Sequence, residues 1–229
     1  MNRTMYNLIE NYMYECMKDA AHDPEHIFRV LYISLNIVSK MSESINSDIL
    51  IASCLLHDIG RNEQFKNHNI CHAETGGIMA KEFLLRNGWS EKNSNHVKNC
   101  ISTHRFRGNN VPETLEAKIL FDSDKLDAVG CLGIARTLMY KGSVDNNLYE
   151  IKDGKICFGE NKNDKETFLK EYNFKLKNLY DNFYTKEAAE MAKSQKGYAQ
   201  MYYNNLVDQI MGIYESKEII KEYIIESGK

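Results

Sequence analysis

A histidine and an aspartate close the most apolar segment of the chain and give the first sign of chemistry. Residues 48–59 read DILIASCLLHDI, which is apolar nearly all round and predicts a helix buried in the core, with His57 and Asp58 at its end. A buried carboxylate is costly unless it is paired, and the negative end of a helix repels it further. A bound cation would offset both costs. The alternatives are a hydrogen-bonded His57–Asp58 pair and an Asp58 side chain turned to solvent.

Two further residues, on other predicted helices, point to the same interior. His26 lies on the inward stripe of a helix that should begin at Pro24, with Asp23 as its cap. Along 117–131, helical spacing places Asp124 on the apolar face and Asp122 on the polar face. A lone inward histidine is usually a satisfied core residue, so the metal interpretation depends on the combination. Three helices then direct imidazoles or carboxylates inward, a ligand mix suited to Mn, Fe, Ni, Zn or Mg.

The remaining histidines divide by their surroundings. His72 begins a predicted helix that contains Gly76 and Gly77, and His104 ends another just before Arg105. Either histidine alone would more often be a surface or capping residue. Three histidines lie in polar surroundings and are expected at the surface: His22, His68 and His96.

The elements that must position these residues are predicted to be helices. They are expected over about 3–19, from Pro24, and over about 48–59, 72–86, 91–104 and 112–140, with two or three more within 164–225. Segment 61–71 is polar and is expected to be a loop. Asp153-Gly154 between two short segments predicts a β-hairpin near 148–159. The result is an all-α helical bundle in one domain over 1–229, with the metal-site core at about 20–140 and C-terminal helices at about 164–225.

Composition excludes several classes of protein. The net charge of −3 argues against bulk electrostatic binding to nucleic acid. No apolar run reaches the length of a membrane helix, and the first 15 residues lack the pattern of a signal peptide. Six widely spaced cysteines, some inside apolar strings as at Cys54 and Cys131, are expected to be buried, reduced thiols. We therefore expect a cytoplasmic protein, and a homodimer is compatible with the sequence.

The order His26, His57-Asp58, Asp124 resembles the H…HD…D signature of the HD superfamily of metal-dependent phosphohydrolases. The flanking segments HDPEHIFRV, LLHDIGR and SDKLDAVGCLGIART are similar to the corresponding segments of small bacterial HD hydrolases of the YedJ/YpgQ type, and the likeness covers about 20–215. Two positions differ. Arg61 stands where some HD nucleotidases have a glutamate, which leaves the general base unassigned, and H-R-F at 104–106 replaces H-S-F.

This resemblance implies a ligand set and a reaction. Four residues match the one-metal ligand set, namely His26, His57, Asp58 and Asp124, and His72 and His104 match the added ligands of two-metal versions, with Asp58 bridging. The cofactor would be one or two divalent ions (Mn, Fe, Ni or Mg) that activate water. Asp58 and Arg61 are the expected catalytic residues, and the candidates for binding substrate phosphate are Arg61, Arg29, Arg105 and Lys125.

The implied activity is a phosphohydrolase acting on a nucleotide or a related phosphate ester or anhydride. Nucleotide pyrophosphohydrolase, nucleotidase and phosphodiesterase activities all remain open. Two alternatives belong to other classes. One is a di-iron oxygenase, because some HD-fold proteins use the two-metal set for oxygen chemistry. The other is a non-catalytic nucleotide-binding regulator that has kept the fold.

Overall fold

The computed structural model describes residues 1–17, 24–105 and 110–224 of the chain. It is helical apart from one two-stranded sheet, which confirms the predicted all-α class and the hairpin. Its contacts group the chain into two compact units. Unit 1 comprises Met1–Asp127 and Asn182–Met191, and unit 2 comprises Ala128–Asp181 and Ala192–Lys229. The proposal of one domain over 1–229 stays a prediction.

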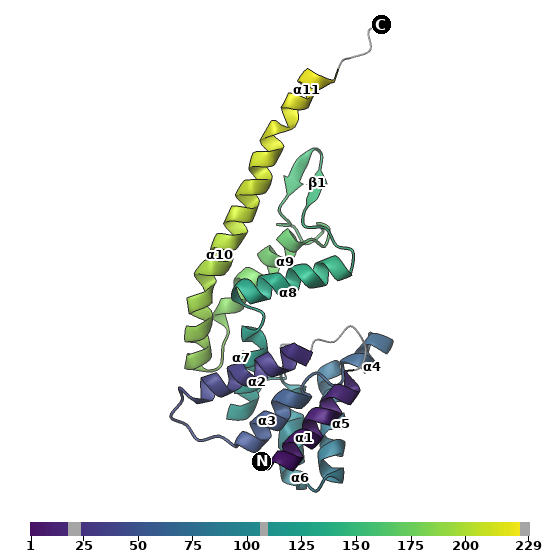
Figure 1. Cartoon of the computed structure of the whole chain (residues 1–229), viewed down its shortest axis with the longest axis vertical. Helices are drawn as coiled ribbons and strands as arrows, with labels where there is room; N and C mark the ends of the chain where they lie inside the picture. Colours follow the sequence, from purple (N-terminus) through teal and green to yellow (C-terminus); the bar gives the residue numbers. More distant parts are fainter. Residues whose placement is uncertain (18–23, 106–109, 225–229) are drawn as a thin grey trace. The chain divides into compact units, whose positions relative to one another are not determined.

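Unit 1 is a helical bundle built around the short apolar helix α3 (Figure 1). Its helices are α1 (Arg3–Cys16), α2 (Pro24–Val38), α3 (Ser47–Leu56), α4 (Arg61–Lys66), α5 (His72–Arg86), α6 (Glu91–Ser102) and α7 (Leu115–Leu126). Helix α3 contacts α1, α2, α5, α6 and α7, which is why its sequence is apolar nearly all round. The side chain of Asn46 caps α3, and those of Ser90 and Thr114 cap α6 and α7.

Unit 2 contains the predicted hairpin and most of the longest helix. Its elements are α8 (Gly130–Ser143), β1 (Glu150–Lys152), β2 (Lys155–Cys157), α9 (Phe168–Phe174), a 3-10 helix (Leu176–Asp181), α10 (Lys186–Glu215, from Ala192 onward), a second 3-10 helix (Ser216–Ile219) and α11 (Ile220–Tyr223). Asp153 and Gly154 both have positive φ, 53° and 73°, as a tight hairpin turn requires. Phe168 and Tyr172 are buried in the core of this unit.

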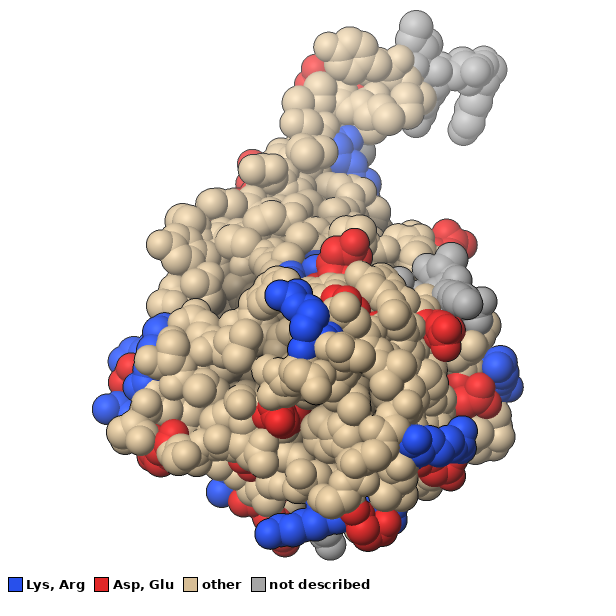
Figure 2. Space-filling model, turned by 60° about the horizontal axis from the view of Figure 1, so that its bottom comes forward, with Lys and Arg blue, Asp and Glu red and all other residues tan. Residues whose placement is uncertain are grey.

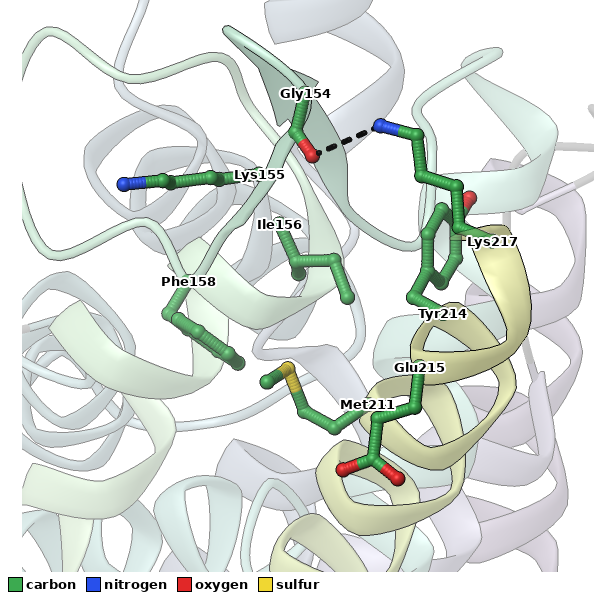
Figure 3. A pocket seen from close by; sticks show the side chains of 8 residues that line it. All are labelled: Gly154, Lys155, Ile156, Phe158, Met211, Tyr214, Glu215 and Lys217. Atoms are coloured by element: carbon green, nitrogen blue, oxygen red, sulfur yellow. Dashed lines mark hydrogen bonds between the residues drawn. The ribbon is translucent and has the colours of Figure 1, made fainter. Parts of the chain in front are cut away.

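A cavity of about 360 Å³ lies between the hairpin and the end of α10 (Figure 3). The Lys217 ammonium donates a hydrogen bond of 3.5 Å to the Gly154 carbonyl across it. It is lined by Gly154, Lys155, Ile156, Phe158, Met211, Tyr214, Glu215 and Lys217. None of the predicted metal ligands or phosphate-binding residues lines it, so the expected chemistry lies in unit 1.

Two predictions of local structure were wrong. Residues 61–66 form helix α4 rather than a loop, because the Gln64 backbone amide donates to the Gly60 carbonyl at 3.2 Å and Lys66 pairs with Glu63 at 3.0 Å. The predicted helix 112–140 begins at Leu115, after its Thr114 cap, and is divided into α7 and α8. The division falls before Gly130, whose φ of 66° cannot continue a right-handed helix.

Some further expectations concern single residues. The first helix ends at Cys16, and both the Asp23 cap and the surface position of His22 lie outside the described residues. Cys54 and Cys100 are buried as expected, whereas Cys131 is exposed because it lies in the first turn of α8 rather than in a continuous buried helix.

The sequence predicted neither a membrane-spanning helix nor a surface for bulk binding of nucleic acid. No helix among the described residues is long and apolar enough to cross a membrane. Figure 2 shows Lys and Arg side chains interspersed with Asp and Glu side chains on the face drawn, without a broad patch of one sign.

Candidate metal centre

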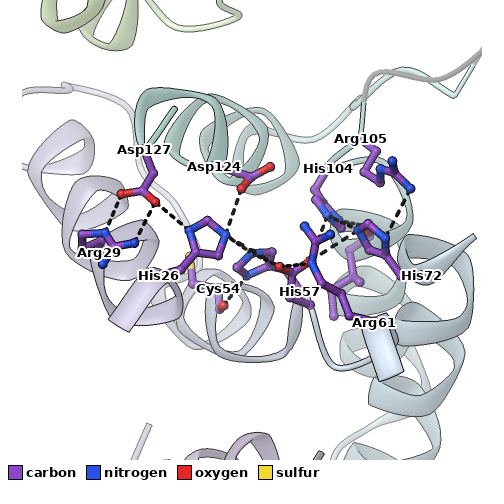
Figure 4. A network of polar contacts seen from close by, with 12 residues as sticks. His26, Arg29, Cys54, His57, Arg61, His72, His104, Arg105, Asp124 and Asp127 are labelled. Atoms are coloured by element: carbon purple, nitrogen blue, oxygen red, sulfur yellow. Dashed lines mark hydrogen bonds and ion pairs between the residues drawn. The ribbon is translucent and has the colours of Figure 1, made fainter. Parts of the chain in front are cut away.

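Five side chains with metal-binding atoms converge inside unit 1 (Figure 4). They come from helices α2 and α5, from the turn after α3 and from the end of α6. They are His26, His57, Asp58, His72 and His104, and each is at most 5% exposed. These residues form two groups, each able to hold one ion, that share Asp58.

The first group is His26, His57 and Asp58. The Nε2 atoms of the two imidazoles are 3.3 Å apart. The Nδ1 of His57 donates to the Cys54 carbonyl at 2.8 Å, and the Nδ1 of His26 donates to the Asp127 carboxylate at 2.7 Å. The two Nε2 atoms therefore face each other at short range, and a bound cation would stabilise this arrangement once the Nε2 proton of His26 is displaced.

The second group, Asp58 with His72 and His104, repeats this arrangement. The two Nε2 atoms are 3.4 Å apart. The Nδ1 of His104 donates to the Ile101 carbonyl at 2.6 Å, and that of His72 lies 2.7 Å from Gln64 Oε1. Again the two Nε2 atoms and one Asp58 oxygen face a single point.

Asp58 presents one carboxylate oxygen to each group. Its Oδ2 lies 3.7 Å from the Nε2 atoms of both His26 and His57. Its Oδ1 lies 3.4 Å from His72 Nε2 and 3.7 Å from His104 Nε2, and it is buried without a hydrogen-bond partner. A buried, unpaired carboxylate oxygen between imidazole lone pairs is costly. Each group therefore fits a divalent ion, and Asp58 is common to both groups.

Gly60 allows the two groups to meet. It follows the HD pair, and a Cβ placed there would lie 2.3 Å from the His72 carbonyl oxygen and 2.6 Å from the Gly76 nitrogen. A larger residue would therefore push α5, and His72 with it, away from Asp58.

Asp124 and the basic residues lie around these groups with different partners. Asp124 Oδ1 is 3.2 Å from His26 Nε2, and its side chain is 26% exposed. Arg61 Nε donates to Asp58 Oδ2 at 2.6 Å, and Arg105 Nη1 lies 3.2 Å from His72 Nδ1. Arg61 thus contacts the carboxylate that both groups share, and Arg105 contacts the second group. Figure 4 shows both arginines on the side of His72 and His104.

The other two basic candidates are placed less directly. Arg29 Nε donates to Asp127 Oδ1 at 2.7 Å, which places it behind His26. Lys125 Nζ donates to the Asn182 carbonyl at 2.6 Å and lies 4.7 Å from the Phe183 ring centroid. The structure therefore brings Arg61 and Arg105 to the ligands, and gives Arg29 and Lys125 other partners.

The sequence interpretation of α7 needs one correction and one addition. Asp122 is fully buried, not on a polar face, because its carboxylate accepts hydrogen bonds from the Tyr184 and Thr185 amides before α10. Asp127, which supports His26, was missed. Its position three residues after Asp124, on the same side of the helix, was the available signal.

The histidines of the site differ in the pKa of their imidazoles. Burial lowers the pKa of His57 to about 4 and that of His72 to about 3, so both rings are neutral and able to bind metal near pH 7. Burial also acts to lower the pKa of His26, but hydrogen bonds to the Asp124 and Asp127 carboxylates outweigh it and raise the pKa to about 9. Burial would raise the pKa of Asp58, yet Arg61 and the surrounding imidazoles hold it well below its usual value.

The raised pKa of His26 predicts that metal binding releases a proton. At pH 7 metal-free His26 carries a proton, because its pKa of about 9 lies above that pH. Metal binding must displace it, so about one proton should be released from His26, and apparent affinity should rise from pH 7 to pH 9. Calorimetric titration of metal-stripped protein in buffers of different ionisation enthalpy measures this release. Binding at pH 7 without proton release would contradict the assignment.

Replacing Asp127 with asparagine should weaken metal binding by roughly 10- to 100-fold, the usual effect of losing a carboxylate that orients a metal-binding histidine. The Arg29→Gln variant is the matched control, because it removes the ion pair to Asp127 and keeps the carboxylate on His26. Equal losses in the two variants, measured by metal titration, would show that the Asp127 contact with His26 is not the important one.

The chain is similar to a known protein family and to several known proteins. The protein-family model for the HD domain matches residues 25–129 of this chain. An uncharacterized Bacillus subtilis protein, YpgQ, is 25% identical over 203 residues, 86% of this chain and 88% of YpgQ. A crystal structure of YpgQ in complex with ADP has a TM-score of 0.70 at 22% identity and covers 90% of this chain and 95% of that one.

Two solved structures of HD-superfamily hydrolases are also similar. One, from Bacillus thuringiensis, is 25% identical with a TM-score of 0.68, covering 90% of this chain and 97% of its own. The other, a predicted hydrolase from an uncultured Thermotogales bacterium, is 26% identical with a TM-score of 0.60, covering 91% and 99%.

Proposed function

Residues 25–129 of this chain form an HD domain, and from that premise we propose that the protein is a metal-dependent phosphohydrolase acting on a nucleotide or a related phosphate ester or anhydride. The observation that carries the proposal is Asp58, whose two oxygens each face a pair of imidazole nitrogens, one of these oxygens lacking any hydrogen bond. The similarity to HD-superfamily hydrolases supports a hydrolytic reaction.

The donor set indicates which ions would fit. Each group offers two imidazole nitrogens and one shared carboxylate oxygen, and Asp124 lies beside His26. The imidazoles suit Fe, Ni or Zn, and the shared carboxylate also suits Mn or Mg. Bound there, a divalent ion would lower the pKa of a water molecule toward neutrality and offset charge on the phosphoryl group.

The chain's own residues supply the binding of phosphate. Arg61 is held at Asp58, and its side chain is 42% exposed, so its guanidinium can reach a phosphate at the site entrance. Arg105 lies next to His72 on the same side. Two guanidinium groups beside a metal pair suit an anionic phosphate substrate, and the ADP complex of YpgQ supports a nucleotide.

The variant Arg61→Ala is expected to raise KM for a phosphate substrate about ten-fold or more, since a hydrogen bond to a charged group contributes roughly 1.5–3 kcal/mol. KM should be compared at saturating metal, because Arg61 also donates to the Asp58 carboxylate and its loss can change metal affinity. Steady-state kinetics with metal analysis tests this. Arg61→Lys is the control, as it keeps the charge and loses the planar fork. An unchanged KM in Arg61→Ala would remove Arg61 from the substrate site.

The decisive experiment is a screen for phosphate and pyrophosphate release. Metal-stripped protein would be assayed against a nucleotide panel with Mn, Mg, Ni, Zn or Fe added singly. Hydrolysis that requires a metal supports the proposal. Oxygen uptake with an iron pair would favour the di-iron oxygenase, and nucleotide-induced stabilisation without turnover under any metal would favour a regulator.

A further inference from the structure

The ring of His72 is approached by two groups that require opposite positions of its proton. Gln64 Oε1 lies 2.7 Å from Nδ1 and can only accept a hydrogen bond, so it requires the proton on Nδ1. Arg105 Nη1 lies 3.2 Å from the same nitrogen and can only donate, so it requires a lone pair there (Figure 4). Burial lowers the pKa of His72 to about 3, so the neutral ring carries one proton near pH 7 and can satisfy only one of these groups.

The main-chain carbonyl of Ile70 fixes which atom of the Gln64 side chain faces His72. Gln64 Nε2 donates to that carbonyl at 3.0 Å, in the segment that joins α4 to α5. Turning the amide over would bring two accepting oxygens together at this point, which is unfavourable. The accepting oxygen is therefore held toward His72, and it lies closer to the ring than Arg105 does. The proton is then on Nδ1, and the Nε2 lone pair is left for a metal ion.

The other tautomer of His72 would close the second ligand group. It places the proton on Nε2, which lies 3.4 Å from Asp58 Oδ1 and 3.4 Å from His104 Nε2. Both of these atoms are acceptors, because the Nδ1 of His104 donates to the Ile101 carbonyl and leaves the Nε2 lone pair free of a proton. A proton there would occupy the point that a divalent ion needs. The second group therefore binds metal in the tautomer that Gln64 selects.

We propose that Gln64 is a positioning residue, which holds His72 in the metal-binding tautomer against Arg105. Arg105 favours the tautomer that excludes the second ion, so the two side chains act on one ring in opposite directions. Replacing Gln64 would leave the ring to Arg105, Asp58 and His104, which all favour a proton on Nε2. The inference rests on the metal centre of the proposed function, and it adds that occupancy of the second group depends on residue 64 as well as on the ligands.

Titration of the metal-stripped, full-length protein with Zn²⁺ tests the role of residue 64. The wild type should bind one ion in each group. Gln64→Met keeps the length of the side chain but lacks an accepting oxygen, and it should weaken binding of the second ion by about 10- to 100-fold. Gln64→Glu keeps an acceptor for Nδ1 and should retain that ion. The control is Glu63→Ala in the same helix, which removes the ion pair to Lys66 and should leave the affinity for both ions unchanged.

The tautomer can also be observed directly. The nitrogen chemical shifts of the His72 ring in metal-free protein should show the proton on Nδ1 in the wild type and on Nε2 in Gln64→Met. In an Arg105→Met background, the effect of Gln64→Met on binding of the second ion should be at least about five-fold smaller, because the opposing donor is gone. Equal effects in the two backgrounds, loss of the second ion in Gln64→Glu, a wild type that binds a single ion, or a wild-type ring protonated on Nε2 would each overturn the inference.

None of these measurements requires turnover, so they separate this inference from the proposed activity. A protein that gives the expected titrations and chemical shifts but releases no phosphate or pyrophosphate from nucleotides would keep the role of Gln64 and lose the proposed function. Metal-dependent hydrolysis together with unchanged second-ion affinity in Gln64→Met would have the opposite meaning. Circular dichroism confirms that each variant keeps its helices.

Discussion

The Asp58→Ala variant is expected to lose both metal ions and to reduce phosphohydrolase turnover by more than about 100-fold, since loss of a supporting partner alone already costs 10- to 100-fold. The reason is that Asp58 is the shared member of both ligand groups. Its removal leaves each group with two imidazole nitrogens and without the carboxylate oxygen that completes it. Elemental analysis of purified protein, together with turnover in added metal, measures the effect.

A buried carboxylate of the same type provides the control for Asp58. Asp122 is also fully buried in unit 1, but its partners are the Tyr184 and Thr185 amides. Asp122→Asn should lower thermal stability and leave metal content per folded chain unchanged. If Asp58→Ala retained full metal content and turnover, the proposed site and reaction would both be wrong.

The second large effect concerns the number of ions. Combining His72→Ala with His104→Ala should reduce bound metal from about two ions per chain to about one, because the group of His26, His57 and Asp58 stays complete. Turnover should fall by about 100-fold if both ions contribute to charge stabilisation. Metal analysis of wild type and double variant in parallel decides the question. Equal metal content in the two would show that His72 and His104 hold no ion.

Local signals in the sequence predicted the helices that carry ligands. The helix beginning at His72 ends at Arg86 as expected, since Asn87-Gly88 supplies a positive φ of 84° at Gly88. The apolar segment before His57 is buried on every side, as its composition indicated. Short-range rules such as caps, glycines and periodicity were sufficient there.

The same rules failed for α7, where both sides of the helix are buried. Asp124 lies beside His26, on the side predicted for it, but Asp122 is fully buried instead of lying on a polar face, because its carboxylate pairs with amides 62 and 63 residues away. Periodicity cannot identify the inner face of a helix that is covered all round, and contacts this distant in sequence leave no local pattern. Asp127 was missed although its spacing of three residues from Asp124 places it on the same side of the helix.

The four imidazoles are oriented by two different kinds of anchor, and this difference affects how the site can evolve. His57 and His104 are held by carbonyl oxygens of their own chain segments, at Cys54 and Ile101, which no side-chain substitution can delete. His26 and His72 depend on the replaceable side chains of Asp127 and Gln64. A substitution at position 127 or 64 would therefore remove the anchor of a single imidazole, whereas the main-chain anchors of His57 and His104 persist whichever side chains surround them.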